Sequence, residues 1–181
     1  DMIKINLIGN VYYALHKLAN RFSHIYLSSV IEGEVSTLSI KGRSRILFPE
    51  RMKVGKNCCI NDSVIMHCGG GITLGDNVTI STGAMLLSRS YDTTNWIQEC
   101  QKSECDMCHT ENGIFLGNHT WVAAGAIVLP GTKITGEGVI IAAGAVLSGE
   151  IREDYVLVAG VPAKIIKQFD ENRYVNNKKI R

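Results

Sequence analysis

The chain has 181 residues, of which 45% are hydrophobic, 20% are charged and only 7% are aromatic. This composition excludes an intrinsically disordered chain and fits one globular domain. The formal net charge of +2 does not by itself indicate a nucleic-acid-binding surface. Because no apolar stretch approaches about eighteen residues and the N-terminus lacks a signal-peptide pattern, we expect a cytoplasmic protein.

Residues 3–22 are predicted to form an amphipathic helix within an N-terminal segment at 1–27. Its apolar residues recur at helical spacing, at Ile8, Val11, Tyr12, Leu15, Leu18, Ala19 and Phe22. We expect this helix to pack on the body of the protein or on a neighbouring subunit. Contact with a membrane surface is the less favoured alternative. Short apolar runs in residues 28–53 then predict strands.

A repeat of six residues dominates the sequence from residue 54 onward. Its first position is aliphatic at Val54, Ile60, Met66 and Ile72, then after a two-residue slip at Leu74, Ile80 and Leu86, and later at Leu116, Val122, Val128, Ile134, Ile140 and Val146. Small residues usually occupy position five, which fits a short strand followed by a tight turn. Three units make one triangular coil, so the sequence predicts a parallel β-helix with coils at 54–71, 74–91, 116–133 and 134–151.

The period fails over residues 92–113, a polar insertion for which we favour a functional role. The insertion contains the pattern CDMCH at residues 105–109, which matches c-type haem attachment. Together with Cys100, residues Cys105, Cys108 and His109 also offer four soft ligands suited to zinc. We expect neither group, because haem attachment needs export and one short loop seldom closes a tetrahedral site. The six cysteines are expected to be reduced.

Three segments carry a resemblance to a known family: ITLGDNVTI at 72–80, LGNHTWVAAGAIVLPG at 116–131 and VLVAGVPAK at 156–164. Over residues 54–169 the chain resembles the hexapeptide-repeat acyltransferases, and within them the galactoside and maltose O-acetyltransferases. The resemblance implies an all-β fold, a left-handed parallel β-helix over residues 28–169, with a short C-terminal helix and a polar tail at 170–181.

The same resemblance implies a homotrimer that uses acetyl-CoA as co-substrate. The acetyl group would pass to a sugar or glycan-precursor hydroxyl at a site between subunits. An N-acetyltransferase acting on an amino sugar is the near alternative. A β-helix that has lost its catalytic base and serves as a binding or scaffold subunit is the non-enzymatic one.

In this family a histidine acts as the general base and an acidic residue assists it. These positions fall here on Tyr91 and Gly69, so both members of the pair are absent. A tyrosine with a pKa of about 10 is a poor base at neutral pH. The candidates are Tyr91 itself, the adjacent Asp92, His109 reaching over from the neighbouring subunit, and His67. A purely structural role stays open for His67, Tyr91 and His109.

Other positions match the family directly. Asn61 matches an asparagine that contacts the acceptor, and its amide can both donate and accept a hydrogen bond. Trp121 matches a tryptophan near the active-site cleft, with packing between coils as the structural alternative. Ala124 and Ala142 match small residues past which the pantetheine arm of the coenzyme runs. Lys164 and Lys167 are candidates to pair with the coenzyme phosphates.

Overall fold

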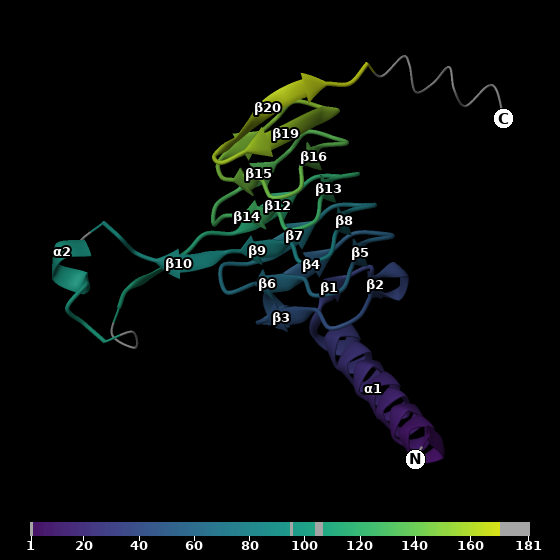
Figure 1. The fold of residues 1–181 in the computed structure, drawn as a ribbon. Coiled ribbons are helices and arrows are strands. Elements are labelled where there is room, and N and C mark those ends of the chain that lie inside the picture. Colours follow the sequence, from purple (N-terminus) through teal and green to yellow (C-terminus); the bar gives the residue numbers. More distant parts are fainter. Residues whose placement is uncertain (1, 95, 104–106, 171–181) are drawn as a thin grey trace.

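The computed structural model describes residues 2–94, 96–103 and 107–170. It contains the helices α1 (Met2–Val30) and α2 (Trp96–Glu99) and the short 3-10 helices η1 (Val35–Thr37) and η2 (Pro49–Arg51). The rest of the body is a stack of triangular coils (Figure 1). This confirms the parallel β-helix predicted from the six-residue repeat.

Three sheets form the sides of the coils. Sheet A holds β1 (Glu32–Gly33), β4 (Met52–Val54), β7 (Ile72–Leu74), β12 (Ile114–Leu116), β15 (Lys133–Ile134) and β18 (Glu150–Ile151). Sheet B holds β2 (Ser39–Ile40), β5 (Cys59–Ile60), β8 (Thr79–Ile80), β13 (Trp121–Val122), β16 (Ile140–Ile141), β19 (Val156–Gly160) and β20 (Ala163–Gln168). Sheet C holds β3 (Arg45–Leu47), β6 (Ile65–His67), β9 (Met85–Leu87), β14 (Ile127–Val128) and β17 (Val146–Leu147).

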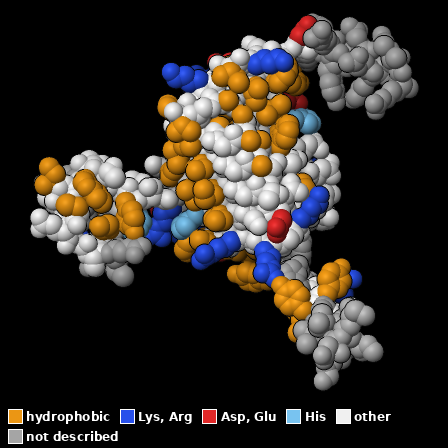
Figure 2. Space-filling view, in the orientation of Figure 1, with side chains coloured by type: hydrophobic (Ala, Val, Ile, Leu, Met, Phe, Trp, Pro, Cys, Tyr) orange, Lys and Arg blue, Asp and Glu red, His pale blue; other side chains and the backbone are white. Residues whose placement is uncertain are grey.

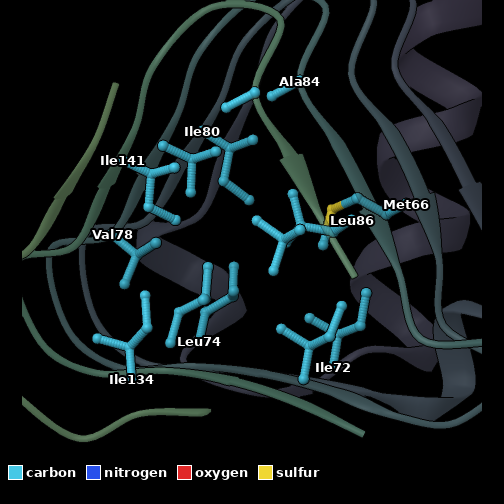
Figure 3. Packing of buried hydrophobic residues seen from close by; sticks show 14 of the residues in the cluster. Met66, Ile72, Leu74, Val78, Ile80, Ala84, Leu86, Ile134 and Ile141 are labelled. Carbon is cyan, nitrogen blue, oxygen red and sulfur yellow. The ribbon is translucent and has the colours of Figure 1, made fainter. Parts of the chain in front are cut away.

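Aliphatic side chains stacked along the axis form the core (Figure 3). In sheet A, for example, parallel pairing places Val54, Leu74, Leu116, Ile134 and Ile151 one above another, and all five are buried. No Phe, Tyr or Trp lies in the core formed by the described residues. Branched aliphatic side chains fill so narrow a triangle in ordinary rotamers, and each contributes about 1.5–3 kcal/mol on burial. The low aromatic content follows from this packing.

The predicted register is correct for most of the chain and wrong in the last two repeats. Val54 pairs with Leu74, twenty positions later, which confirms the two-residue slip. In β16 and β17, however, the fully buried residues are Ile141 and Leu147, which pair with Val122 and Val128. The predicted inward residues Ile140 and Val146 are only partly buried. The turn between β15 and β16 holds one extra residue, and Gly138 accommodates it with a left-handed φ of +65°.

The two ends of the solenoid differ from the predictions. Helix α1 continues to Val30, beyond the predicted end at residue 22, and projects away from the first coil (Figure 1). Among its described side chains, Leu27 alone is buried, so α1 does not lie along its own body as one expectation had it. At the other end β20 pairs antiparallel with β19, and no C-terminal helix occurs up to residue 170. Residues 171–181, most of the predicted polar tail, lie outside the described range.

In the part of the chain that the structure describes, no helix has both the length and the apolar character needed to cross a membrane.

Candidate active site

The insertion leaves the solenoid through a two-stranded hairpin. Strand β10 (Arg89–Tyr91) follows β9, and β11 (His109–Glu111) returns the chain to β12. The strands pair antiparallel, with Arg89 opposite Glu111 and Tyr91 opposite His109. Helix α2 lies at the far end of the loop, well away from the body (Figure 1). The predicted insertion at 92–113 therefore contains the returning strand, and its stem begins at residue 89.

Four polar side chains share one face of this hairpin. Alternate residues of a strand point to the same side, so Arg89, Tyr91, His109 and Glu111 lie together, and we call them the hairpin quartet. The rings of Tyr91 and His109 are 4.8 Å apart between centroids and tilted by 36°. The Arg89 Nε lies 3.8 Å from Glu111 Oε1. His109 thus reaches the expected base position within its own chain, whereas the sequence suggested an approach from the adjacent subunit.

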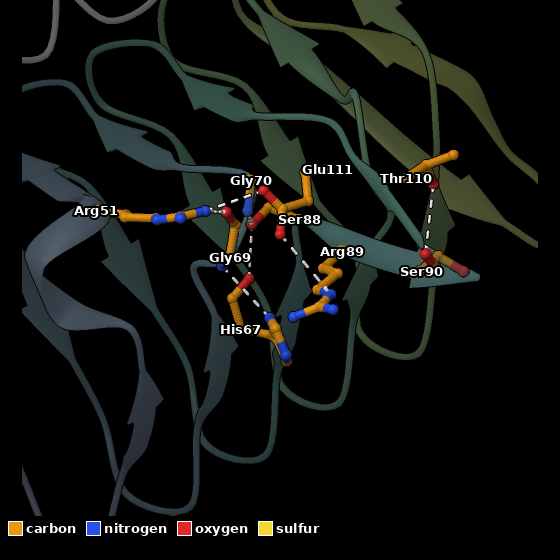
Figure 4. A network of polar contacts seen from close by, with 9 residues as sticks. All are labelled: Arg51, His67, Gly69, Gly70, Ser88, Arg89, Ser90, Thr110 and Glu111. Atoms are coloured by element: carbon orange, nitrogen blue, oxygen red, sulfur yellow. Dashed lines mark hydrogen bonds and ion pairs between the residues drawn. The ribbon is translucent and has the colours of Figure 1, made fainter. Parts of the chain in front are cut away.

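The second pair of the quartet is anchored to the coil beneath it (Figure 4). Arg51 donates hydrogen bonds from Nη1 to the Gly69 carbonyl and, over 3.0 Å, to Glu111 Oε2. Glu111 is therefore held close to Gly69, where the sequence lacks the acidic residue of the family. Strand β11 consequently places a histidine beside Tyr91, where the family has its histidine, and a carboxylate near Gly69, where the family has its acidic residue.

A buried serine joins the hairpin to the solenoid. Ser88 is fully buried, accepts a 2.9 Å hydrogen bond from the Gly70 N–H, and donates one of 2.6 Å to the His67 carbonyl. The Asn112 N–H in turn donates to the Ser88 carbonyl over 3.0 Å. These bonds tie both strands of the hairpin stem to β6 and its following turn. These hydrogen bonds therefore attach the hairpin quartet to the body of the solenoid.

His67 and Arg89 have distinct surroundings in this corner. The His67 Nδ1 accepts a 3.3 Å hydrogen bond from the Gly69 N–H, and its ring packs 5.3 Å from that of Phe48. This environment fits the structural interpretation of His67. The Nε of Arg89 is buried and has no hydrogen-bond partner among the described residues. Sequence reasoning missed Arg89 and Glu111, because only the antiparallel pairing of β10 and β11 brings them together.

Asp92 adds a negative charge next to Tyr91. Hydrogen bonds from the side chain and the backbone N–H of Thr94 lower the pKa of the Asp92 carboxyl below its ordinary value. The Asp92 N–H donates to the Cys108 carbonyl over 2.9 Å and closes the base of the loop. Asp92 is therefore an ionised carboxylate at neutral pH.

The residues expected to meet the acceptor and the coenzyme arm lie at a different corner. Asn61 follows β5, Ala124 follows β13 and Ala142 follows β16, so all three occupy the turns that lead from sheet B into sheet C. The Asn61 Nδ2 donates a 3.0 Å hydrogen bond to the Ile80 carbonyl. Beside the alanines, Gly125 and Gly144 have φ values of +66° and +68° with open space around them. Left-handed turns thus keep this corner free of bulky side chains.

Trp121 and the two lysines lie on sheet B. Trp121 is 46% exposed on the outer side of the sheet, and its Nε1 donates to Ser81 Oγ over 2.9 Å. Lys164 and Lys167 are exposed on β20, and the Lys167 Nζ lies 4.9 Å from the ring centroid of Phe169. Strand β20 belongs to the same sheet as β13 and β16. All the expected coenzyme residues are therefore on or beside sheet B.

A single chain does not bring the hairpin quartet next to the residues expected to contact the acceptor and the coenzyme. The chain enters each strand of sheet C from the corner that holds Asn61, Ala124 and Ala142. It leaves sheet C after β9 at the opposite edge, where the hairpin quartet begins. Asn61 and His109 are therefore separated by the width of sheet C.

The residues weighed as zinc ligands do not form a cluster in the described part of the chain. No three His, Cys, Asp or Glu side chains there are grouped as metal ligands would be. Cys100 is an exposed free thiol and Cys108 is exposed, while Cys105 lies outside the described residues.

Comparisons with known proteins bear on this fold and site. No family model matches the chain. A curated protein of Escherichia coli named as the lipopolysaccharide biosynthesis O-acetyl transferase WbbJ is 30% identical over 132 residues, 71% of this chain and 63% of the relative. The E. coli galactoside O-acetyltransferase is 23% identical over 130 residues, 68% of this chain and 57% of the relative. The chain thus spans between about half and two thirds of the length of the curated relatives it matches.

Among solved structures, a maltose O-acetyltransferase from Clostridium difficile has a TM-score of 0.69 and 22% identity, and the match covers 80% of this chain and 73% of that one. These findings confirm the resemblance to the hexapeptide-repeat acyltransferases. Within that class, the relatives named above are O-acetyltransferases, two of them named for a sugar.

Proposed function

We propose that the protein is an acetyl-CoA-dependent O-acetyltransferase that acts on a sugar or glycan precursor, with His109 as the general base. One observation carries the proposal: the hairpin places His109 against Tyr91 and Glu111 near Gly69, the two positions where the family's base and acid are absent. The names of the relatives support the acceptor class.

In the proposed reaction, an acceptor hydroxyl attacks the carbonyl carbon of the acetyl thioester while the imidazole of His109 takes the hydroxyl proton. The new C–O bond forms, the C–S bond breaks, and the imidazolium returns the proton to the departing coenzyme A thiolate. Tyr91 positions the imidazole through the ring contact.

We further propose that the site is completed between subunits of a homotrimer. The base and the residues matched to acceptor and coenzyme lie at opposite edges of sheet C, so a neighbouring copy must bring one set to the other. The outer face of sheet C suits such a contact, since pairing aligns Ile65, Met85, Ile127 and Val146 in one partly exposed apolar row. Figure 2 shows hydrophobic side chains gathered in a band over this side of the body.

The coenzyme is proposed to run along the corner between sheets B and C. The small residues Ala124 and Ala142, with the open glycine turns beside them, leave the backbone accessible to a pantetheine arm. Lys164 and Lys167, exposed on the same sheet, are placed to pair with phosphate groups. The exposed apolar residues of α2, Trp96 and Ile97, would then contact the neighbouring subunit.

The test follows consumption of the acetyl thioester by chromatography against a panel of hydroxyl and amino sugars. His109→Asn is expected to lower kcat about 10²- to 10⁴-fold, the usual contribution of a general base. His119→Asn is the matched control. The side chains of Asn57, Asn77 and His119 are hydrogen-bonded in a row, and all three residues have left-handed φ values. Asparagine at position 119 should therefore adopt the same backbone conformation as its two neighbours in the row. The rate of His119→Asn should remain within about twofold of the native rate.

Three results would contradict parts of the proposal. An unchanged rate in His109→Asn with a lost rate in Tyr91→Phe would assign the base to Tyr91. Transfer only to amino sugars would make the protein an N-acetyltransferase. No turnover on any acceptor, together with no coenzyme A binding by calorimetry, would leave a binding or scaffold role.

Mixed subunits test whether the site is shared. Asn61→Ala and His109→Asn chains are each expected to be nearly inactive, whereas co-expressed mixtures should recover activity. Recovery is expected because some subunit contacts then pair a native Asn61 with a native His109. Absence of recovery in mixed trimers would place both residues in a site within one chain.

A further inference from the structure

Helix α1 carries a regular apolar repeat that its own chain does not cover. Val11, Leu15, Leu18, Phe22 and Ile25 follow one another at alternating spacings of four and three residues, and all five are 50–63% exposed. In the sequence, Ile8 continues the same spacing towards the N-terminus. This alternation is the a/d heptad pattern of a coiled coil, with Leu15 and Phe22 at a and Val11, Leu18 and Ile25 at d.

The contact between α1 and the body leaves this seam free. Leu27, the buried residue of the helix, occupies an f position, which lies opposite the a/d seam. Tyr12, at a flanking e position, accepts a 2.6 Å hydrogen bond from Arg43 Nη2 of the body. The solenoid therefore holds α1 by its f and e side, while the heptad seam faces away from the body.

The residues around the seam favour another helix as its partner. In a parallel coiled coil, a g residue meets the e residue five positions later in the neighbouring helix. Here that pairing joins Ala14 with Ala19 and Arg21 with Tyr26, the second a cation–π pair, and no like charges meet. A helix lying on a membrane usually has a strongly charged polar face. Between residues 10 and 30, α1 carries only two charged side chains, Lys17 and Arg21, among uncharged polar residues such as Asn10, Ser23 and Ser28.

We propose that α1 forms a parallel three-stranded coiled coil with the α1 helices of two other copies of this chain. The number of strands rests on the homotrimer of the proposed function. In the single chain α1 projects from one end of the solenoid (Figure 1), so a threefold axis along the solenoid would bring three such helices to the same end. So short a coiled coil is stable because the joined bodies hold the helices at high local concentration.

Disulfide trapping in the full chain tests the arrangement. Leu18→Cys places a thiol at a d position, where two of three chains should cross-link into a covalent dimer upon mild oxidation. Tyr13→Cys is the matched control, because Tyr13 occupies an f position and is 70% exposed. Both variants retain the same native cysteines, so the dimer band of Tyr13→Cys measures the background. If the dimer band of Leu18→Cys is no stronger than this background, while the native mass is three times that of one chain, the coiled coil is overturned and the homotrimer is retained.

A second pair of variants keeps the inference testable if Leu18→Cys itself loosens the helices. Leu15→Glu with Leu18→Glu should raise the concentration at which the trimer dissociates at least about tenfold in sedimentation equilibrium, whereas Tyr13→Glu should not change it. An unchanged dissociation concentration in the double variant overturns the inference. A native mass of one chain overturns the homotrimer, and the inference with it.

Vesicle sedimentation distinguishes the membrane alternative. Native protein is expected to remain in the supernatant with vesicles of phosphatidylcholine and phosphatidylglycerol. Binding that the double glutamate variant loses, without Leu18→Cys cross-linking, would identify α1 as a membrane-surface helix instead.

Discussion

Replacing Gly70 with alanine is expected to destabilise the protein and to displace the hairpin that carries the quartet. A Cβ on Gly70 would lie 2.7 Å from the Asn112 nitrogen, 2.9 Å from the Glu111 carbonyl carbon, and closer still to the Ser88 carbonyl oxygen. Real Cβ atoms are essentially never within 3.0 Å of such neighbours. Because all three atoms belong to the backbone, a change of rotamer cannot relieve the contact.

The expected loss of unfolding free energy follows from these contacts. Overpacking a tight site costs about 1–3 kcal/mol. The Asn112-to-Ser88 and Gly70-to-Ser88 hydrogen bonds, 3.0 and 2.9 Å long, would both be strained, at about 0.5–1.5 kcal/mol each. We therefore expect Gly70→Ala to lose about 2–6 kcal/mol. Gly83→Ala is the control, since Gly83 has a φ of +70° but no atom near its Cβ position, and it should lose only the left-handed cost of about 1–2 kcal/mol.

Urea unfolding followed by circular dichroism measures both losses, and acetyl transfer is compared under conditions where both variants are folded. Gly70→Ala should lose activity as well as stability, because Glu111 and Asn112 at the stem must move. Gly83→Ala should keep its activity. The reasoning is refuted if Gly70→Ala is no less stable than Gly83→Ala.

Two further predictions concern titratable groups. Burial raises the pKa of the Cys68 thiol to about 12, with a smaller contribution from Glu50. Cys68 should therefore not react with a disulfide reagent at pH 8 until the protein unfolds, whereas the exposed Cys100 should react at once. A Cys68→Ser variant with fewer fast-reacting thiols would contradict this. The lowered pKa of Asp92 means that its contribution to stability is present above the unfolded value of about 3.9 and is lost as the pH falls through the folded value. Asp92→Asn should therefore have a lower unfolding free energy than the native protein at pH 7, and this difference should shrink below about pH 4. Urea unfolding of both proteins at pH 7, 5 and 3 measures the difference, and a value that stays constant would contradict the prediction.

The solenoid itself could be predicted from local sequence. Each coil repeats the same local choice, an aliphatic residue facing inward followed by a small or left-handed turn residue, so a period of six residues is enough to indicate three short strands and three corners. The two-residue slip before Leu74 could be counted for the same reason. The period could not reveal the extra residue at Gly138, because Ile140 and Ile141 are both suitable inward residues and only the pairing with Trp121 and Val122 selects Ile141.

The candidate site depended on contacts that no local pattern encodes. The sequence places His109 eighteen positions after Tyr91, in a polar segment without periodicity, and antiparallel pairing of β10 with β11 brings the two rings together. The same pairing carries Glu111 to Arg51 and Gly69. Helix α1 shows the same division: its heptads are present in the sequence, but only the burial of Leu27 shows which side of the helix faces the body. The solenoid can be predicted from the sequence because every coil packs the same kinds of residues in the same way. The contacts of the hairpin and of α1 each occur once, between segments far apart in the chain, so only the folded structure determines them.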